Sequence, residues 1–319
     1  MVEIIDDAAG LSDFHAEWSQ FATSVPDATP FQMPDWLATW WSHLGSGALR
    51  TMVFREHGDL TGVLPLFLHE WQERRQLTLL GSGVSDYLDP LFNRERIPEI
   101  VREIRVCLNA WTDWDLCDWQ DLGHNTPLSA FGETVEDTPC SAVSLPASFE
   151  KFLNQRPPDL KRNLRRYRAK SIEIGPAIFE VSDSADPALL DVLVALHEKR
   201  WQRAGEPGMI QSNRSEAFVR DVAARFAGTG SLFILTLRFG KTPVAVILAL
   251  RAGATIFGYL SAFDPDYEKL GVGRELLARS LRYAHQHGYR RWDFLRGEEP
   301  YKFSWGAQRI PKRRVRIFR

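Results

Sequence analysis

The chain has 319 residues, which is enough for about two domains, and its 44% hydrophobic and 25% charged residues are typical of a globular protein. A formal net charge of −2 excludes the global basic field of a protein that binds nucleic acid non-specifically. The longest apolar run, residues 244–250, is too short to cross a bilayer, so we expect no membrane span. Three cysteines, an odd number, and the lack of a basic-then-apolar leader predict a cytoplasmic protein without a disulfide framework.

Strand and helix patterns succeed one another through the first 120 residues. Runs of β-branched and aromatic residues predict strands, whereas apolar residues three and four apart predict helices. The expected strands are residues 2–5, 49–55, 62–69, 75–80 and 114–119, and the expected helices are residues 11–22, 34–44 and 95–110.

Turn-forming and small residues dominate residues 123–148, which we therefore expect to separate two domains. The predicted division is residues 1–140 and residues 141–319. A helix over residues 159–170 follows, with six basic residues. This helix is either a solvated face or a contact for an anion, such as CoA phosphates or a tRNA backbone.

The second half repeats the element order of the first half. Because the order matches, a duplicated αβ unit is the simplest interpretation. The expected strands are residues 178–182, 232–238, 244–251, 255–262, 291–295 and 312–318, and the expected helices are residues 187–204, 215–227 and 272–287.

Residues 254–274 join a strand to a helix through Gly271-Val272-Gly273. A glycine pair lets a ligand approach the backbone closely. The helix N-terminus then offers unpaired N–H groups and a positive dipole end to an anion, typically a phosphate. The alternative is an ordinary tight turn before a helix.

Three strands and this helix, preceded by two helices, resemble the GNAT acyltransferases. The resemblance implies acetyl-CoA or another acyl-CoA as co-substrate, and no metal. It places the pantetheine and the pyrophosphate against the end of the strand and the loop that follows it. The residues implied are Leu260, Ser261, Ala262, Leu270, Gly271, Val272, Gly273 and Arg274, and Glu268 stands where the family usually has Arg or Gln. The first half has no Gly-x-Gly that opens a helix, so we expect only the second unit to bind CoA.

A second resemblance rests on residues 293–306, DFLRGEEPYKFSWG. This segment is similar to a signature of the BioF2-like and CelD-like acetyltransferases, and to the aromatic-Lys-x-x-aromatic-Gly ending of the FemABX transferases. Further agreement lies in residues 31–36, 85–89, 162–166 and 196–201 (FQMPDW, SDYLD, RNLRR and LHEKRW). The resemblance implies an α/β (α+β) fold of two tandem GNAT-like units, each a mixed, mostly antiparallel twisted sheet flanked by helices.

Four residues are candidates for catalysis. The family signature implies that Lys302 stabilises charge or contacts the acceptor. Asp86 and Asp264 follow corresponding strands of the two halves, where a carboxylate could remove a proton, but each could also form an Asx turn before a proline. His197 could act as a base or be a packed core histidine.

The acceptor contacts are expected from aromatic and cationic side chains close to these residues. The candidates are Tyr87, Trp36, Arg200, Trp201 and Tyr301. No His or Cys spacing typical of a metal site occurs, so no metal ligand is predicted.

Three functions remain open from the sequence. The first is an acyl-CoA-dependent N-acyltransferase that transfers an acyl group, with acetyl expected, to an amine of a small molecule, a sugar or a cell-envelope precursor. The second is a FemABX-like aminoacyltransferase, in which tRNA would be the partner. The third is an inactive duplicated GNAT scaffold in a polysaccharide pathway.

Overall fold

The computed structural model describes residues 1–319. Two compact units divide the chain: Met1–Pro139 together with Pro311–Arg319, and Cys140–Ile310. Strands β9 (Glu133–Ser144) and β15 (Gln308–Phe318) each begin in one unit and end in the other. No helix combines the length and the apolar character that crossing a bilayer requires.

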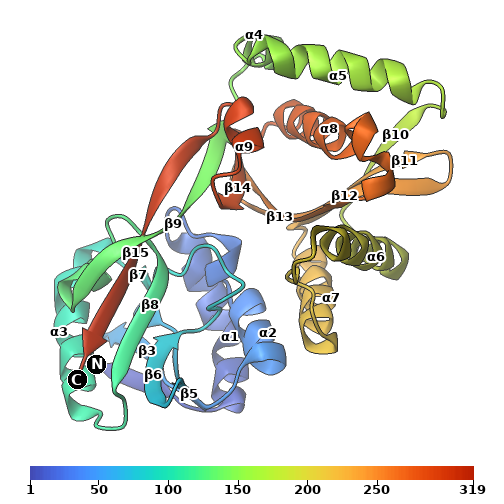
Figure 1. The fold of residues 1–319 in the computed structure, drawn as a ribbon. Helices are drawn as coiled ribbons and strands as arrows, with labels where there is room; N and C mark the ends of the chain where they lie inside the picture. The colour runs from blue at the N-terminus through green and yellow to red at the C-terminus, as the bar shows by residue number, and fades with distance from the viewer. The chain divides into compact units, whose positions relative to one another are not determined.

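The first unit contains two runs of paired strands with helices beside them (Figure 1). One sheet has the strand order β1-β3-β4-β7. In the other sheet, the strands of this unit are hydrogen-bonded neighbours in the order β15-β8-β6-β5-β2. The strands are β1 (Val2–Ile5), β2 (Ala48–Leu49), β3 (Thr51–Glu56), β4 (Asp59–Leu64), β5 (Leu66–Trp71), β6 (Arg74–Leu79), β7 (Leu91–Phe92) and β8 (Leu116–Gly123). The α-helices are α1 (Ala8–Ser24), α2 (Pro34–Leu44) and α3 (Ile97–Ala110).

The single strand expected over residues 62–69 is two strands in the structure. Pro65 lies between β4 and β5 and has no N–H to donate to a ladder. β4 pairs with β3 and β7, whereas β5 pairs with β2 and β6. The chain therefore changes sheets at the proline.

The second unit has strands in the order β10-β11-β12-β13-β14-β9. Helix α8 lies against one face of this sheet and α6 against the other, and α5 lies outside α8 (Figure 1). The strands are β10 (Ala177–Ser182), β11 (Leu232–Phe239), β12 (Thr242–Ala252), β13 (Thr255–Phe263) and β14 (Arg291–Arg296). The helices are α4 (Phe149–Asn154), α5 (Pro158–Ser171), α6 (Pro187–Ala204), α7 (Asn213–Gly228), α8 (Val272–Gln286) and α9 (Pro300–Ser304), with the 3-10 helix η4 (Pro265–Leu270).

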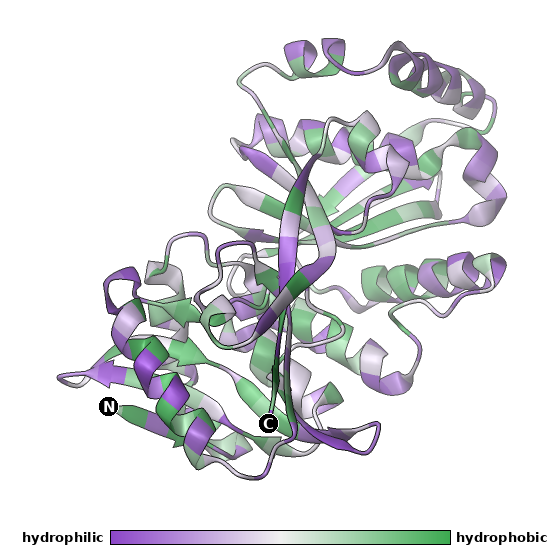
Figure 2. Cartoon of the chain, turned by 60° about the vertical axis from the view of Figure 1, so that its left-hand side comes forward, coloured by the Kyte–Doolittle hydropathy of each residue, from purple (hydrophilic) through white to green (hydrophobic).

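Burial in the second unit follows the periodicity of its helices. Leu276, Leu281 and Ala284 of α8 are buried on the sheet, together with apolar residues of β11 and β12. Helix α5 is predominantly hydrophilic (Figure 2), and only Leu160, Leu164 and Tyr167 of it are buried. These three residues lie at helical spacing on one face, which faces α8 and η4.

The α/β fold with mostly antiparallel sheets and flanking helices is confirmed, but the place of the last strand differs from the prediction. Residues 312–318 were expected in the second unit, whereas Lys312–Phe318 pairs with β8 of the first unit. Val315 lies opposite Trp119, and both side chains are fully buried. Sequence patterns also missed β9, which falls in the expected linker, and the short helices α4 and α9.

Candidate functional site

The neighbouring parallel strands β13 and β14 separate in the second unit. They pair only from Thr255 to Phe257, although β13 continues to Phe263. A bulge at Tyr259 shifts the register of β13 on β12, where Leu248 faces Leu260 but Ala249 faces Gly258. Bulges bend a strand and often lie beside active sites. Beyond Phe257, the facing edges of β13 and β14 are therefore free of ladder pairing with each other.

A cavity of about 420 Å³ lies at this separation. Such a volume is within the usual range for small-molecule sites, and the walls are mainly apolar with a few polar groups. The lining residues come from β12, β13, α8 and β14 with one residue each from α5, α6, η4 and α9: Val246, Ile247, Gly258, Ser261, Ala262, Phe263, Gly271, Val272, Gly273, Arg274, Leu276, Leu277, Trp292, Phe294, Tyr167, Arg200, Glu268 and Tyr301.

The N-terminus of α8 opens onto this cavity. Gly271 is its N-cap with φ of 63°, a left-handed conformation that favours glycine. No side chain caps the helix, and Val272, Gly273 and Arg274 lie in the cavity wall. The first-turn N–H groups are therefore placed to bind an anion.

Two side chains modify this helix end. A Cβ on Gly271 would lie 2.4 Å from the ring of Tyr167, so α5 packs directly on the glycine. The Arg274 guanidinium donates to the Tyr167 hydroxyl at 2.9 Å. The carboxylate-bearing Glu268 lies in the same wall. The positive field of the helix end is thus supplemented by an arginine and partly offset by a glutamate.

A strained bend ends β14 next to the cavity. Leu295 has φ of 62°, which is unusual for a branched residue, and its N–H donates to the buried Asp293 carboxylate at 2.8 Å. The Lys302 ammonium, 1% exposed, donates to the carbonyls of Leu295, Arg296 and Gly297 at 3.3, 2.5 and 3.3 Å and pairs with Glu299 at 2.9 Å. Lys302 therefore fixes the bend between Phe294 and Tyr301.

The structure brings several of the predicted site residues into one wall and leaves others outside it. The predicted residues that line the cavity are Ser261, Ala262, Gly271, Val272, Gly273, Arg274, Arg200 and Tyr301. The predicted residues of the second unit outside the lining are Leu260, Leu270, His197, Trp201, Asp264 and Lys302.

His197 is only 3% exposed and lies on α6, outside the cavity lining. Its ring lies 6.0 Å from that of Trp201, and a Cβ on Gly208 would collide with both side chains. Burial, with a smaller effect of the Arg200 charge, lowers the pKa of His197 to about 4. The imidazole is therefore neutral at physiological pH.

Asp264 is engaged by its own neighbours. Its carboxylate pairs with Lys199 at 2.6 Å and accepts the N–H of Asp266 at 3.0 Å as the cap of η4. Arg200, in contrast, reaches the cavity: its guanidinium donates to the carbonyl of Ser261 at 2.8 Å and lies over the ring of Phe263. These contacts tie α6 to the end of β13.

Three predicted site residues lie in the first unit. Trp36 is fully buried, and its indole N–H donates to the Ser85 hydroxyl at 2.8 Å. Asp86 is also buried, and the ammonium of the buried Lys312 lies 4.1 Å from the centre of the Tyr87 ring. Trp36 thus packs the core, whereas residues 85–89 form a polar segment close to a buried cation.

Several residues of the cavity wall were not predicted as site residues. Trp292 and Phe294 alternate along β14, so the strand pattern would have placed them on one face. Tyr167 follows Leu160 and Leu164 on the apolar face of a basic helix. This position predicts that the side chain is packed, but it does not identify the element against which it packs. Glu268 was noted only as a departure from the family pattern.

Residues 158–303 match the model of a protein family described as an acetyltransferase (GNAT) domain. Similar solved structures include FemX, with a TM-score of 0.68 and 11% identity over 94% of this chain and 95% of that chain. L-PGS from Bacillus licheniformis gives a TM-score of 0.64 and 13% identity over 98% of this chain and 92% of that chain. A tandem GNAT protein from the clavulanic acid biosynthesis pathway gives a TM-score of 0.51 and 12% identity over 100% of this chain and 98% of that chain. No curated protein matches the chain.

Proposed function

We propose that this chain transfers an acyl group from acyl-CoA to an amine by direct attack, because residues 158–303 match the model of a GNAT acetyltransferase domain. The observation that carries the proposal is the cavity between the separated strands β13 and β14, which reaches the uncapped N-terminus of α8. An extended amide-containing chain fits between strands that have separated from each other, and a phosphate fits a helix N-terminus. We expect the acyl group to be acetyl. We expect the acceptor to be a small molecule, a sugar or a cell-envelope precursor.

The residues that would hold acyl-CoA belong to two segments. Ser261, Ala262 and Phe263 would flank the pantetheine arm, and the backbone of Gly271 to Arg274 would face the pyrophosphate. Arg274 would add a positive charge there. When bound, acyl-CoA supplies an activated thioester.

The chain contributes positioning and proton handling. Backbone N–H groups near Leu260–Ala262 would polarise the acyl carbonyl, as donors do in an oxyanion hole. Although Tyr301 is 37% exposed, desolvation of its phenol in the cavity wall, with a smaller effect of Glu299, raises its pKa to about 12, so the phenol stays protonated and can donate to a leaving sulfur. Lys302 holds the bend that places Tyr301 and Phe294 in the wall.

The candidates for the base that deprotonates the amine are Asp86, Asp264 and His197, as the sequence predicts. Asp264 is paired with Lys199, and neutral His197 would have to act through water because it lies outside the lining. Asp86 belongs to the polar segment of the first unit. The three free cysteines support the expectation of a reducing, cytoplasmic setting.

Calorimetric titration of the purified chain with acetyl-CoA tests the proposal. We expect saturable binding by the wild type, and loss of binding in Gly273→Trp because the indole would fill the cavity wall at the helix N-terminus. Gly273→Ala is the matched control, since its Cβ would meet only the Phe263 ring at 3.3 Å. Failure of the wild type to bind acetyl-CoA or any longer acyl-CoA contradicts the proposed donor.

A second candidate, aminoacyl transfer from charged tRNA, is favoured by a specific observation. Tyr167 packs on Gly271, and Glu268 adds a carboxylate to the same cavity wall as the helix N-terminus. A donor without a pyrophosphate would need neither access to Gly271 beside Tyr167 nor a place next to the Glu268 carboxylate. The test is transfer of a labelled amino acid from charged tRNA, with a charge-reversal variant of Lys161, Arg162, Arg165 and Arg166. Absence of transfer by the wild type eliminates this candidate.

A further inference from the structure

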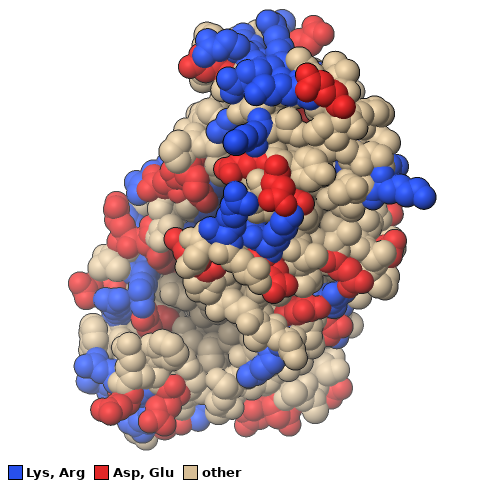
Figure 3. All heavy atoms as spheres, turned by 45° about the vertical axis from the view of Figure 1, so that its right-hand side comes forward, with Lys and Arg blue, Asp and Glu red and all other residues tan.

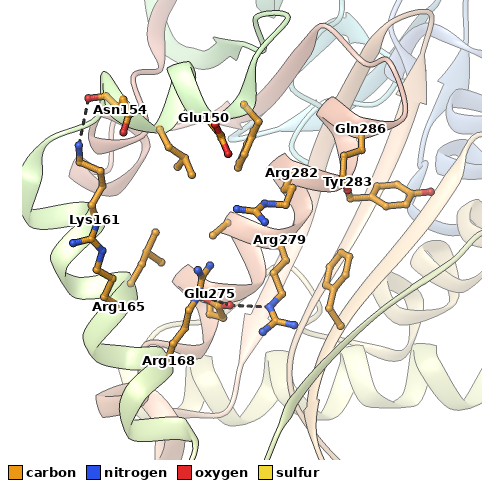
Figure 4. Close-up of a pocket in the computed structure, with 15 residues that line it drawn as sticks. Glu150, Asn154, Lys161, Arg165, Arg168, Glu275, Arg279, Arg282, Tyr283 and Gln286 are labelled. Carbon is orange, nitrogen blue, oxygen red and sulfur yellow. Dashed lines mark hydrogen bonds and ion pairs between the residues drawn. The ribbon is translucent and has the colours of Figure 1, made fainter.

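A second and larger cavity of about 770 Å³ lies on the side of α8 away from the donor cavity. It is bounded by α4, α5, α8 and one residue of β10, and shares no lining residue with the donor cavity. Basic side chains gather at the top of the view in Figure 3, over α5. Figure 4 shows side chains of α5 and α8 on either side of the open space, with the Lys161 ammonium turned toward the Asn154 carbonyl and with Arg168 and Arg279 meeting at Glu275.

Five cations line this cavity in two rows. Lys161, Arg165 and Arg168 lie four and three residues apart on α5, hence on one face and about 10 Å from first to last. Arg279 and Arg282 face them from α8. The only carboxylates in the lining are Glu150 and Glu275, which leaves a formal surplus of three positive charges.

Glu275 organises two of these cations. Its carboxylate is only 5% exposed and pairs with Arg168 at 2.9 Å and with Arg279 at 2.7 Å. A buried acid held by two arginines fixes the guanidinium groups and offsets only one of their two positive charges. The other cations contact no carboxylate: Lys161 donates to the carbonyl of Asn154 at 3.4 Å, and Arg282 lies over the Phe149 ring at 5.3 Å.

The remaining wall is mostly apolar and aromatic, with Asn154 and Gln286 as its uncharged polar members. Phe149, Leu153, Leu164 and Phe179 line it, together with the ring of Tyr283. A simple inorganic anion would leave this surface unused. A ligand with a flat apolar body and several phosphates along a short chain matches both parts of the wall.

We propose that this α5–α8 cavity is a binding site for an organic polyphosphate of the nucleotide type, separate from the donor cavity. The ligand could be a free nucleotide or the nucleotide end of the acyl donor, and these two sources share the same chemistry. The proposal rests on the geometry of this cavity and does not require the donor to be acyl-CoA.

Calorimetric titration of the full chain with ATP at 0.15 M salt is the test. Wild type is expected to bind ATP saturably, and to bind inorganic tripolyphosphate at least about fivefold more weakly because tripolyphosphate has no apolar body. Arg165→Glu and Arg282→Glu, one in each row, should each weaken ATP binding at least about tenfold. Circular dichroism and thermal unfolding of each variant confirm that it is folded.

Arg162→Glu is the matched control, because it makes the same charge change on the same helix outside the lining, where Arg162 pairs with the exposed Asp159. It should change ATP affinity by no more than about twofold, since screening at this salt limits charge effects to about 8 Å. Gly273→Trp, which blocks the donor cavity, should leave ATP binding intact.

Four outcomes would overturn the proposal: no saturable ATP binding by the wild type, equal loss in Arg162→Glu and Arg165→Glu, loss of ATP binding in Gly273→Trp, or tighter binding of an RNA hairpin than of ATP. Titration with CoA identifies the source. Weaker CoA binding in Arg165→Glu assigns the cavity to the nucleotide end of the donor, and unchanged CoA binding assigns it to an independent nucleotide. Failure of acetyl-CoA to bind with ATP binding intact would contradict only the proposed donor.

Discussion

His197 shows how burial alone determines the chemistry of one residue. Its side chain is enclosed by Trp201 and by the chain at Gly208, and its Nδ1 has no hydrogen-bond partner. The imidazole must lose its proton to fold, because an unpaired charge in such a place is costly. Proton uptake is therefore coupled to unfolding.

We predict that His197 makes the chain less stable as pH falls. Its pKa is about 4 in the fold against 6.5 as the ordinary value, so its contribution is complete above pH 6.5 and is lost as pH falls toward 4. As pH falls from 7.5 to 5, the titration of His197 should lower the free energy of unfolding by about 2 kcal/mol. Urea unfolding at both pH values should show a smaller pH dependence for His197→Leu than for wild type.

His57→Asn is the control for this measurement, because His57 is exposed in the turn after β3 and its φ of 52° suits asparagine. It should keep the pH dependence of the wild type. Equal pH dependence for wild type and His197→Leu would show that the buried imidazole is not the group that titrates.

Lys302 marks the limit of sequence reasoning at the residue scale. The aromatic-Lys pattern singled out the residue, and a free ammonium would suit catalysis. In the structure, three backbone carbonyls and Glu299 surround it instead. Residue type predicts what a group can do, whereas its neighbours decide whether the group is free to do it.

At the scale of elements, helix α5 packs on the start of α8. Gly271 turns the chain from η4 into α8 with a left-handed φ, and Tyr167 of α5 lies on it. Any side chain at this position meets both a backbone penalty and a steric one. The two penalties can be separated by experiment.

We predict that Gly271→Ala destabilises the chain by about 2–4 kcal/mol, from the left-handed backbone and from overpacking against Tyr167. Gly253→Ala should cost only about 1 kcal/mol, because Gly253 has φ of 52° but no atom within 4 Å of its added Cβ. In a Tyr167→Ala background, the cost of Gly271→Ala should fall to about that of Gly253→Ala. Urea unfolding of the four variants gives these values, and additivity of the Gly271 and Tyr167 changes would refute the contact.

At the scale of the whole molecule, most of the last strand, from Pro311 onward, belongs to the first unit. β15 pairs with β8 from Lys312 to Phe318, with Val315 fully buried opposite Trp119. The Arg314 guanidinium also pairs with Asp118 of β8. The first unit is thus completed by residues almost 200 positions later in the chain.

We predict that Val315→Asp destabilises the first unit by roughly 3 kcal/mol or more, because it buries a charge without a partner. Hydrogen exchange should show loss of amide protection in β8 and preserved protection in β12 of the second unit. Phe318→Asp is the control, since Phe318 is 58% exposed at the end of the same strand. Loss of protection in β12 but not in β8 would contradict the assignment of this strand.

The sequence by itself determined the kind and order of most of the longer elements in both halves and the junction of β13 with α8. These depend on local causes: hydrophobic period, turn residues and a glycine pair at a helix start. Only the tertiary structure decided that β15 completes the first unit, that Tyr167 covers Gly271, that Asp264 and Lys302 are already paired, and that a second basic cavity lies between α5 and α8. Each of these depends on residues distant in sequence coming together, which no local pattern encodes.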